Sequence, residues 1–287
     1  MTRLTEIESH IGSMSELLDI VSAMRSLASM RVQEAQRAVP GVRRYAESMA
    51  SAIGDAIRLL PEGGGGRPSA GDRRALILYT AEQGFVGGFN QHLLEAMEHD
   101  LSGKDLLFVL GSRGAQLLRE RGHRPAWEHP MATRLASLPE TVRRLAAELY
   151  RTVGRASVNR VEVIFARYRK GSAATIESRL LFPVDLKSFA TATSKLPPLH
   201  NLPPDVLLEN LVAEYVFALL IEAAIESFAS ENAARFSAME AARDNVSRKL
   251  DGLRDEARQA RQDEITTELI DLVTGAEAQR RGTDGAP

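Results

Sequence analysis

Apolar residues at both ends of the chain recur with the alternating three- and four-residue spacing of a coiled-coil seam. The N-terminal seam consists of Ile7, Ile11, Met14, Leu18, Val21 and Ala28. The C-terminal seam consists of Val246, Leu250, Leu253, Ala257 and Ala260. Long isolated helices gain little from propensity alone, so two narrow seams favour pairing. The pattern predicts an antiparallel two-helix coiled coil formed by residues 1–60 and 206–276. The alternative is a compact helical bundle, but the faces outside the seams are mostly charged residues and alanine.

Helix-breaking residues set the expected boundaries. Pro40-Gly41 is expected to kink or interrupt the first helix, because proline removes a ladder hydrogen bond. The glycine-rich segment 61–72 and the proline-rich segment 188–205 are expected to be linkers, the first of them flexible. Residues 277–287 are expected to form a disordered tail.

Residues 73–187 alternate between short apolar runs and helical patterns. A strand is expected at 75–80 and another at 105–111, each followed by a helix, with a further helix at 138–154. Two alternating strands then surround Lys170-Gly171-Ser172, which is typical of a hairpin. Strand–helix alternation predicts a largely parallel, Rossmann-like α/β domain with an added hairpin. The fold class is therefore α/β with long terminal helices.

Composition excludes several classes of protein. The 287 residues carry a net charge of −2, so no overall field recruits nucleic acid. The absence of cysteine excludes disulfides and thiolate chemistry. No window approaches the roughly 18 apolar residues of a membrane span.

No stretch of the sequence predicts catalysis or ligand binding. The glycines of "GFVGGFN" (84–90) lack the spacing and the lysine of phosphate-binding loops, so tight-turn glycines are the favoured interpretation. The six histidines have no metal-ligand spacing, and no carboxylate pair indicates acid–base chemistry. We therefore expect no catalytic residue, no metal and no cofactor.

Three separated motifs of the sequence follow the pattern of one known family. The C-terminal motif is "SENAARFSAMEAARDNV" (230–246) followed by "ARQDEITTELIDLVTGA" (260–276). The N-terminal motif is "IVSAMRSLASMRVQEAQRAVPGVRRYAESM" (20–49), and the central one is "YTAEQGFVGGFNQHL" (79–93). In order and spacing, these motifs resemble the gamma subunit of F-type ATP synthases over residues 1 to about 276.

The motifs also depart from the family pattern. Glu82-Gln83 stands where the family has Asp-Arg, and Val86 replaces its cysteine. The segment Arg31-Val32-Gln33-Glu34 replaces most of a basic run. These differences resemble a divergent branch, such as the alternative-operon ATPases of some bacteria.

The resemblance implies a central-stalk rotor with catalysis on its partners. The implied partners are the alpha and beta subunits of the catalytic ring, the epsilon subunit and the membrane ion-translocating c-ring, with one copy of this chain per complex. The implied location is peripheral, on the cytoplasmic face of the inner membrane. Positions matching Arg261, Gln262 and Thr266 hydrogen-bond to a beta-subunit loop in the family, as a catch that releases on rotation.

Two other classes of function remain as alternatives. One is an α/β nucleotide-binding enzyme with coiled-coil dimerisation arms, which predicts ligand affinity within 73–187. The other is a coiled-coil adaptor without a rotary role.

Overall fold

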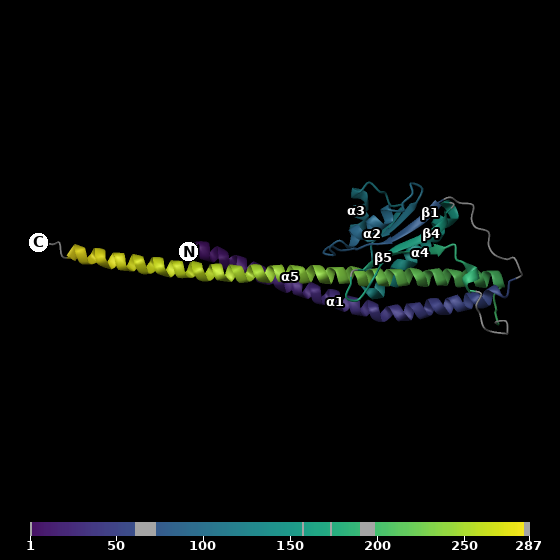
Figure 1. Ribbon diagram of the computed structural model, residues 1–287, viewed down its shortest axis with the longest axis horizontal. Coiled ribbons are helices and arrows are strands. Elements are labelled where there is room, and N and C mark those ends of the chain that lie inside the picture. The colour runs from purple at the N-terminus through teal and green to yellow at the C-terminus, as the bar shows by residue number, and fades with distance from the viewer. Residues whose placement is uncertain (1, 61–72, 157, 173, 190–198, 284–287) are drawn as a thin grey trace. The chain divides into compact units, whose positions relative to one another are not determined.

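The computed structural model describes residues 2–60, 73–156, 158–172, 174–189 and 199–283. These residues form two compact units, one of residues 1–26 with 239–287 and one of residues 27–238. Helices α1 (Thr2–Ile57) and α5 (Pro204–Thr283) contribute residues to both units (Figure 1). The predicted linker at 61–72 lies outside the described residues, as do residues 190–198 of the predicted linker 188–205.

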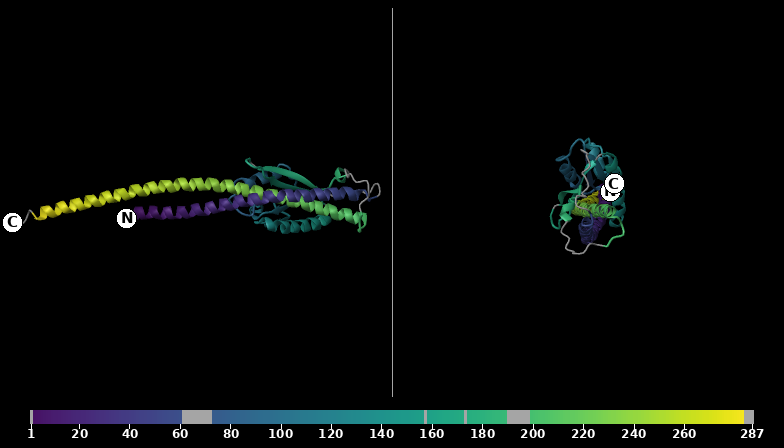
Figure 2. Two further views of the ribbon diagram at one scale, coloured as in Figure 1. Left: turned by 90° about the horizontal axis from the view of Figure 1, so that it is seen from below. Right: turned by 90° about the vertical axis from the view of Figure 1, so that its right-hand side faces the viewer.

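The smaller unit is the predicted antiparallel coiled coil. Its two helical segments run side by side (Figure 2). Arg25 pairs with Glu240 at 2.7 Å, and Glu8 pairs with Arg261 at 2.6 Å, so the partner number falls as the α1 number rises. The seam residues Ile7, Val21 and Leu250 are buried. The antiparallel pairing of the terminal helices was therefore predicted correctly from the three-and-four spacing.

Helix α1 continues through Pro40, so of the predicted kink or interruption, the interruption is wrong. Proline removes one backbone N–H, which leaves a single carbonyl of the preceding turn without its usual donor. Pro40 is exposed, so water can solvate that carbonyl. Ala35 and Val39 before it and Ala46 after it are buried, and their packing keeps both halves of the helix in place.

Helix α5 begins at Pro204, where the missing N–H is one that the first helical turn leaves unpaired in any case. It continues to Thr283, so the expected disorder of 277–287 is wrong for the backbone as far as that residue. The segment Glu277–Arg281 explains the difference, because alanine, glutamine, glutamate and arginine all favour helix. Residues 284–287 lie outside the described part.

The larger unit contains a five-stranded sheet in the order β3-β2-β1-β4-β5. Four of the strands are parallel to one another: β1 (Arg73–Tyr79), β2 (Leu106–Leu110), β3 (Trp127–His129) and β4 (Val158–Arg167). Strand β5 (Thr175–Phe182) pairs antiparallel with β4 and completes the predicted hairpin. The three-residue strand β3 had no recognisable pattern in the sequence.

Helices cover both faces of the sheet (Figure 1). One face packs against α2 (Phe89–Glu98) and α3 (Ser112–Glu120). The other face packs against α4 (Leu138–Ala156), against α5 and against the part of α1 around Val39. Short 3-10 helices occupy Leu135–Ser137 and Leu186–Phe189. The long helices are thus part of the hydrophobic core of the α/β domain.

Candidate partner-binding surfaces

The distal surface, defined as residues 261–273 of α5, contains the three residues of the predicted catch. All three side chains are exposed. The Arg261 guanidinium donates to Glu8 Oε1 at 2.6 Å, and the Thr266 hydroxyl donates to the backbone carbonyl of Gln262 at 2.8 Å. Gln262 and Thr266 therefore lie one turn apart on one face, as their spacing predicted.

The same surface carries large apolar side chains that the sequence analysis did not single out. Between 52% and 70% of each is exposed: Ile265, Leu269, Ile270, Leu272 and Val273. Side chains of this size in water are unfavourable, and their clustering on one helical segment is typical of a surface that binds a partner. The signal was present in the sequence as an apolar run with no matching run near the N-terminus.

A second candidate surface is the glycine loop, residues 82–88, between β1 and α2. Glu82 fixes its start, because the carboxylate accepts hydrogen bonds from Ser112 N at 3.0 Å, Ser112 Oγ at 2.8 Å and Met131 N at 2.9 Å. Arg235 holds its middle by donating to the backbone carbonyls of Gln83 and Gly84, both at 3.4 Å. Two motifs that are far apart in sequence thus meet here.

The glycine loop presents Phe85 to solvent. Phe85 adopts a φ of 60°, which is uncommon for a residue other than glycine, and 68% of it is exposed. Gly87 also has positive φ, as a tight-turn glycine would. The close approach of helix and strand, however, occurs at Gly114, where an added Cβ would lie 2.0 Å from Thr80 Oγ1.

The hydrogen bonds of Glu82 also argue against the nucleotide-binding alternative. In doubly wound sheets, phosphate binds at a helix N-terminus beyond the carboxyl ends of the strands. Helix α3 begins at such a position, and the Glu82 carboxylate already accepts its first backbone N–H, at Ser112. An anion from this chain therefore occupies the place that a nucleotide phosphate would need.

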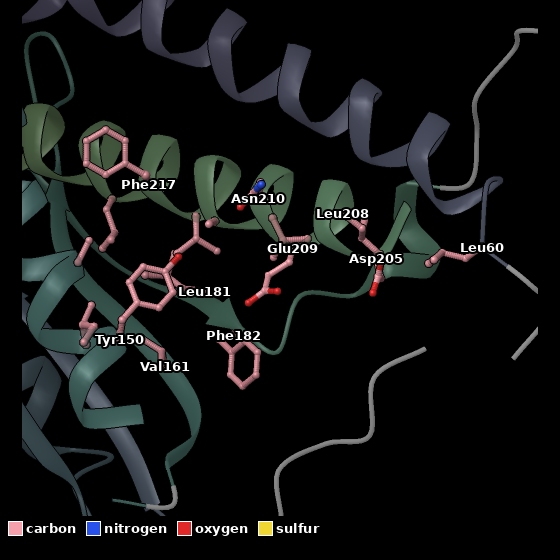
Figure 3. A pocket seen from close by; sticks show the side chains of 16 residues that line it. Leu60, Tyr150, Val161, Leu181, Phe182, Asp205, Leu208, Glu209, Asn210 and Phe217 are labelled. Atoms are coloured by element: carbon pink, nitrogen blue, oxygen red, sulfur yellow. The ribbon is translucent and has the colours of Figure 1, made fainter. Parts of the chain in front are cut away.

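The third candidate surface is an apolar groove of about 510 Å³ lined by α4, β4, β5, the first turns of α5 and Leu60 (Figure 3). Tyr150 and Phe182 point into it with the apolar side chains of α5. Asp205 and Glu209 provide its charged groups, no lining residue is basic, and neither carboxylate has a hydrogen bond or ion pair among the described residues. Burial raises the pKa of Tyr150, and the charges of Glu214 and Glu209 raise it further.

Two further features are absent from the residues that the structure describes. None of the helices in these ranges is both long and apolar enough to cross a membrane. No group of three or more histidine, aspartate or glutamate side chains within the same ranges could hold a metal ion.

Comparison with solved structures identifies the fold. The fold is similar to a chain of the Euglena gracilis mitochondrial ATP synthase, in a structure of its OSCP, F1 and c-ring, with a TM-score of 0.68, 13% identity and coverage of 100% of this chain and 97% of that one. A chain from the central stalk and c-ring of the Tetrahymena thermophila enzyme gives a TM-score of 0.56 at 16% identity, covering 78% and 99%. The paired helices and Rossmann-like domain are thus the fold of an ATP synthase central-stalk subunit.

Sequence comparisons identify the family. Residues 3–279 match the family described as ATP synthase. The chain is 30% identical to the ATP synthase gamma chain of Frankia casuarinae, over 98% of this chain and 99% of that one. It is 26% identical to the sodium ion specific gamma chain of Acetobacterium woodii, over 95% and 97%. The chain belongs to the ATP synthase gamma chain family, as the three motifs indicated.

Proposed function

We propose that this gamma chain is the rotor shaft that couples ion flow through a membrane c-ring to conformational cycling of catalytic beta subunits. The observation that carries the proposal is the coiled coil with its exposed distal surface. Helix α5 pairs with α1 at Arg261 and Glu8, and the segment from Ile265 to Val273 exposes both apolar and hydrogen-bonding side chains. A helix end with such side chains is suited to binding inside a ring of alpha and beta subunits that surrounds it.

The energetics of coupling require a shaft that accumulates work. A charge crossing 100 mV yields only about 2.3 kcal/mol, so several ion transfers must be combined for each ATP. An asymmetric shaft then stabilises a different conformation in each catalytic site of the ring, which is a mechanical population shift. Catalysis in this scheme belongs to the beta subunits, and the gamma chain supplies no catalytic residue and binds no cofactor.

The distal surface is the proposed contact with the ring of alpha and beta subunits. Arg261, Gln262 and Thr266 present a guanidinium, an amide and a hydroxyl that suit a polar loop of the beta subunit. The apolar side chains that follow them suit an apolar inner surface of the ring. The proposed catch is the set of hydrogen bonds from these three residues to the beta subunit, which break at each step of rotation.

The apolar groove is the proposed docking site of the epsilon subunit. Its apolar lining favours apolar side chains, and the carboxylates of Asp205 and Glu209 favour a basic residue beside them. The α/β domain would then be held near the c-ring, peripheral to the cytoplasmic face of the inner membrane. One copy of the chain would serve each complex.

Tyr150 provides a test of the groove. The Tyr150→Ser variant should weaken retention of epsilon by about tenfold, which corresponds to roughly 1.4 kcal/mol. Tyr45→Ser is the matched control, because Tyr45 is also an exposed tyrosine but does not line the groove. Equal retention of epsilon by both variants would assign epsilon to another surface.

Co-expression with candidate alpha and beta subunits tests the rotor function. A stable, ATPase-active assembly that contains one copy of this chain is expected, and in vesicles with the membrane sector it should pump ions when ATP is supplied. An assembly that forms equally well and is equally active without this chain would remove the proposal.

A further inference from the structure

Four charged residues form a cluster that joins both long helices to the sheet. This ion clamp consists of Arg43 on α1, Arg179 on β5, and Glu222 and Glu226 on α5. Arg43 Nε donates to Glu222 at 2.8 Å, and its Nη2 donates to Glu226 at 2.8 Å. Arg179 donates to the second oxygen of Glu222 at 2.7 Å. Arg43 thus spans two carboxylates that lie one helical turn apart.

The two carboxylates are buried. Glu222 is 6% exposed and Glu226 is 3% exposed. The backbone N–H of Tyr168, just beyond β4, also donates to Glu226 at 3.3 Å. The Arg179 guanidinium lies over the ring of Phe165, 5.2 Å from its centroid, so the sheet holds this arginine from a second side. Each carboxylate of α5 is therefore held by α1 and by the β4–β5 hairpin.

The ion clamp resists a kind of movement that the apolar core resists only weakly. Apolar contacts are non-directional, and a small slide of one helix along another exchanges one set of contacts for a similar set. Charge-assisted bonds from a planar guanidinium depend on direction and distance. A slide of α1 along α5 by part of a turn would separate Arg43 from at least one carboxylate and leave that buried charge without its partner.

Other polar contacts tie α5 to the sheet but do not reach α1. The Tyr79 hydroxyl donates to the carbonyl of Leu220 at 3.1 Å, and Ser227 Oγ donates to the carbonyl of Tyr79 at 2.9 Å. These neutral bonds hold one helix only. Arg43 fixes the register of α1 at the level of these contacts, and the Tyr45 hydroxyl adds one exposed hydrogen bond between α1 and α5, to Glu214 at 2.8 Å.

We propose that the ion clamp transmits torque between the α/β domain and the paired helices, with Arg43 as the positioning residue. This inference rests on the proposed rotor function. A shaft whose helices slip under load would still let the catalytic ring hydrolyse ATP, but less of the work would reach the ion-translocating sector. Loss of the clamp therefore lowers the number of ions moved per ATP while hydrolysis continues.

The test uses the complete complex in sealed vesicles, with ATP hydrolysis and ATP-driven ion uptake measured on the same preparation. Arg43→Gln removes the charge that spans the two carboxylates. Arg44→Gln is the matched control, because Arg44 is the adjacent arginine, is exposed and is not part of the clamp. Arg43→Gln should hydrolyse ATP and show a lower ratio of ions to ATP than wild type, whereas Arg44→Gln should keep the wild-type ratio.

Arg43→Lys is a second test variant, and it replaces Arg43→Gln if that variant does not assemble. Lysine is a point charge that cannot span both carboxylates as a guanidinium does, so an intermediate ratio is expected. An unchanged ratio of ions to ATP in the assembled Arg43 variants overturns the proposal. This includes the outcome in which ATP hydrolysis and ion uptake fall in proportion, as expected if Arg43 has a purely structural role. A wild-type complex that hydrolyses ATP without any ion uptake would instead overturn the rotor function itself.

Discussion

Arg261 of α5 donates a hydrogen bond to Glu8 of α1 at 2.6 Å, across the two helices of the coiled coil. The side chains remain 62% and 49% exposed. An exposed ion pair of this kind contributes only about 0–1 kcal/mol. The guanidinium can therefore exchange Glu8 for an acceptor on a partner at little cost, which is the property that a releasable catch requires.

The catch hypothesis predicts that Arg261→Ala or Thr266→Ala impairs ATP turnover of the assembled complex and leaves assembly intact. Each substitution removes one donor that a beta-subunit loop would accept, while the buried seam of the coiled coil is unchanged. Turnover is measured on the purified complex, and subunit content is measured on the same sample. Full turnover in both variants would remove the catch assignment.

Glu8→Ala is the control that separates the catch from the coiled coil. This substitution breaks the same ion pair but keeps the Arg261 guanidinium available to a partner. We expect turnover close to wild type. If Glu8→Ala and Arg261→Ala lowered turnover equally, the intrachain pair would be the feature that matters.

Glu82 offers a test of the α/β domain. Glu82→Ala leaves the backbone N–H groups of Ser112 and Met131 and the Ser112 hydroxyl without their acceptor. Glu82 is only partly buried, and a typical hydrogen bond contributes about 0.5–1.5 kcal/mol to stability, so the midpoint of thermal unfolding should fall. Inorganic phosphate should raise the midpoint of the variant more than that of wild type, because the vacated position at the start of α3 favours an anion.

Glu82→Gln completes this test. Glutamine keeps one carbonyl acceptor but lacks the charge, so its unfolding midpoint should lie between those of wild type and Glu82→Ala. A Glu82→Ala variant as stable as wild type, with the same response to phosphate, would show that the carboxylate does not fix the loop.

Most of the fold could be predicted from the periodic spacing of apolar residues. The spacing of Val21 and Leu250 within their seams depends only on helix geometry, so residues adjacent in sequence were enough to predict it. The parallel sheet followed in the same way from the alternation of apolar runs and helical patterns. The interruption predicted at Pro40 was wrong, because the packing of residues on either side of it outweighs its local preference.

The contacts within the candidate sites could not be predicted, because they join distant parts of the chain. Glu82 and Met131 are 49 positions apart, and Arg43 and Glu222 are 179 apart. In the sequence, Glu222 is one of many carboxylates on a long helix, and no local pattern marks it as buried. The exposed apolar residues after Ile265 were recognisable only once the seam of α1 was seen to end.

The seam itself predicts a difference between two leucines of α5. Leu250 is 2% exposed, whereas Leu269 is 57% exposed. Leu250→Ala should lower the free energy of unfolding by about 2–5 kcal/mol, as expected for a buried leucine. Leu269→Ala should change stability by less than about 0.5 kcal/mol, as expected for a surface substitution. Urea denaturation followed by circular dichroism compares them, and similar losses would contradict the coiled-coil register.

The two carboxylates of the ion clamp should respond oppositely to pH. Burial raises the pKa of Glu226 above its ordinary value of 4.5, against the Tyr168 N–H and the charge of Arg43, which lower it. The folded state therefore binds a proton at Glu226 more tightly than the unfolded state does. Its contribution to stability is fully present below pH 4.5 and is lost as the pH rises through the folded pKa.

Glu222 has the opposite sign. Burial favours a higher pKa, but hydrogen bonds from Arg179 and Arg43 outweigh it and hold the pKa of Glu222 below 4.5. Its contribution is present above pH 4.5 and is lost as the pH falls through the folded pKa. The free energy of unfolding of wild type, Glu226→Gln and Glu222→Gln should be measured by chemical denaturation from about pH 4 to pH 8.

Relative to Glu226→Gln, wild type should gain stability as the pH falls from 8 towards 5, because the variant has no proton to bind at that position. Relative to Glu222→Gln, wild type should show a constant difference above about pH 5 and should lose its advantage only in more acidic solution. Parallel curves for all three proteins would mean that neither carboxylate changes its proton affinity on folding. Protonation of Glu226 removes the negative charge that pairs with Arg43, so acidification should also lower the ratio of ions to ATP in the wild-type complex towards that of the Glu226→Gln variant.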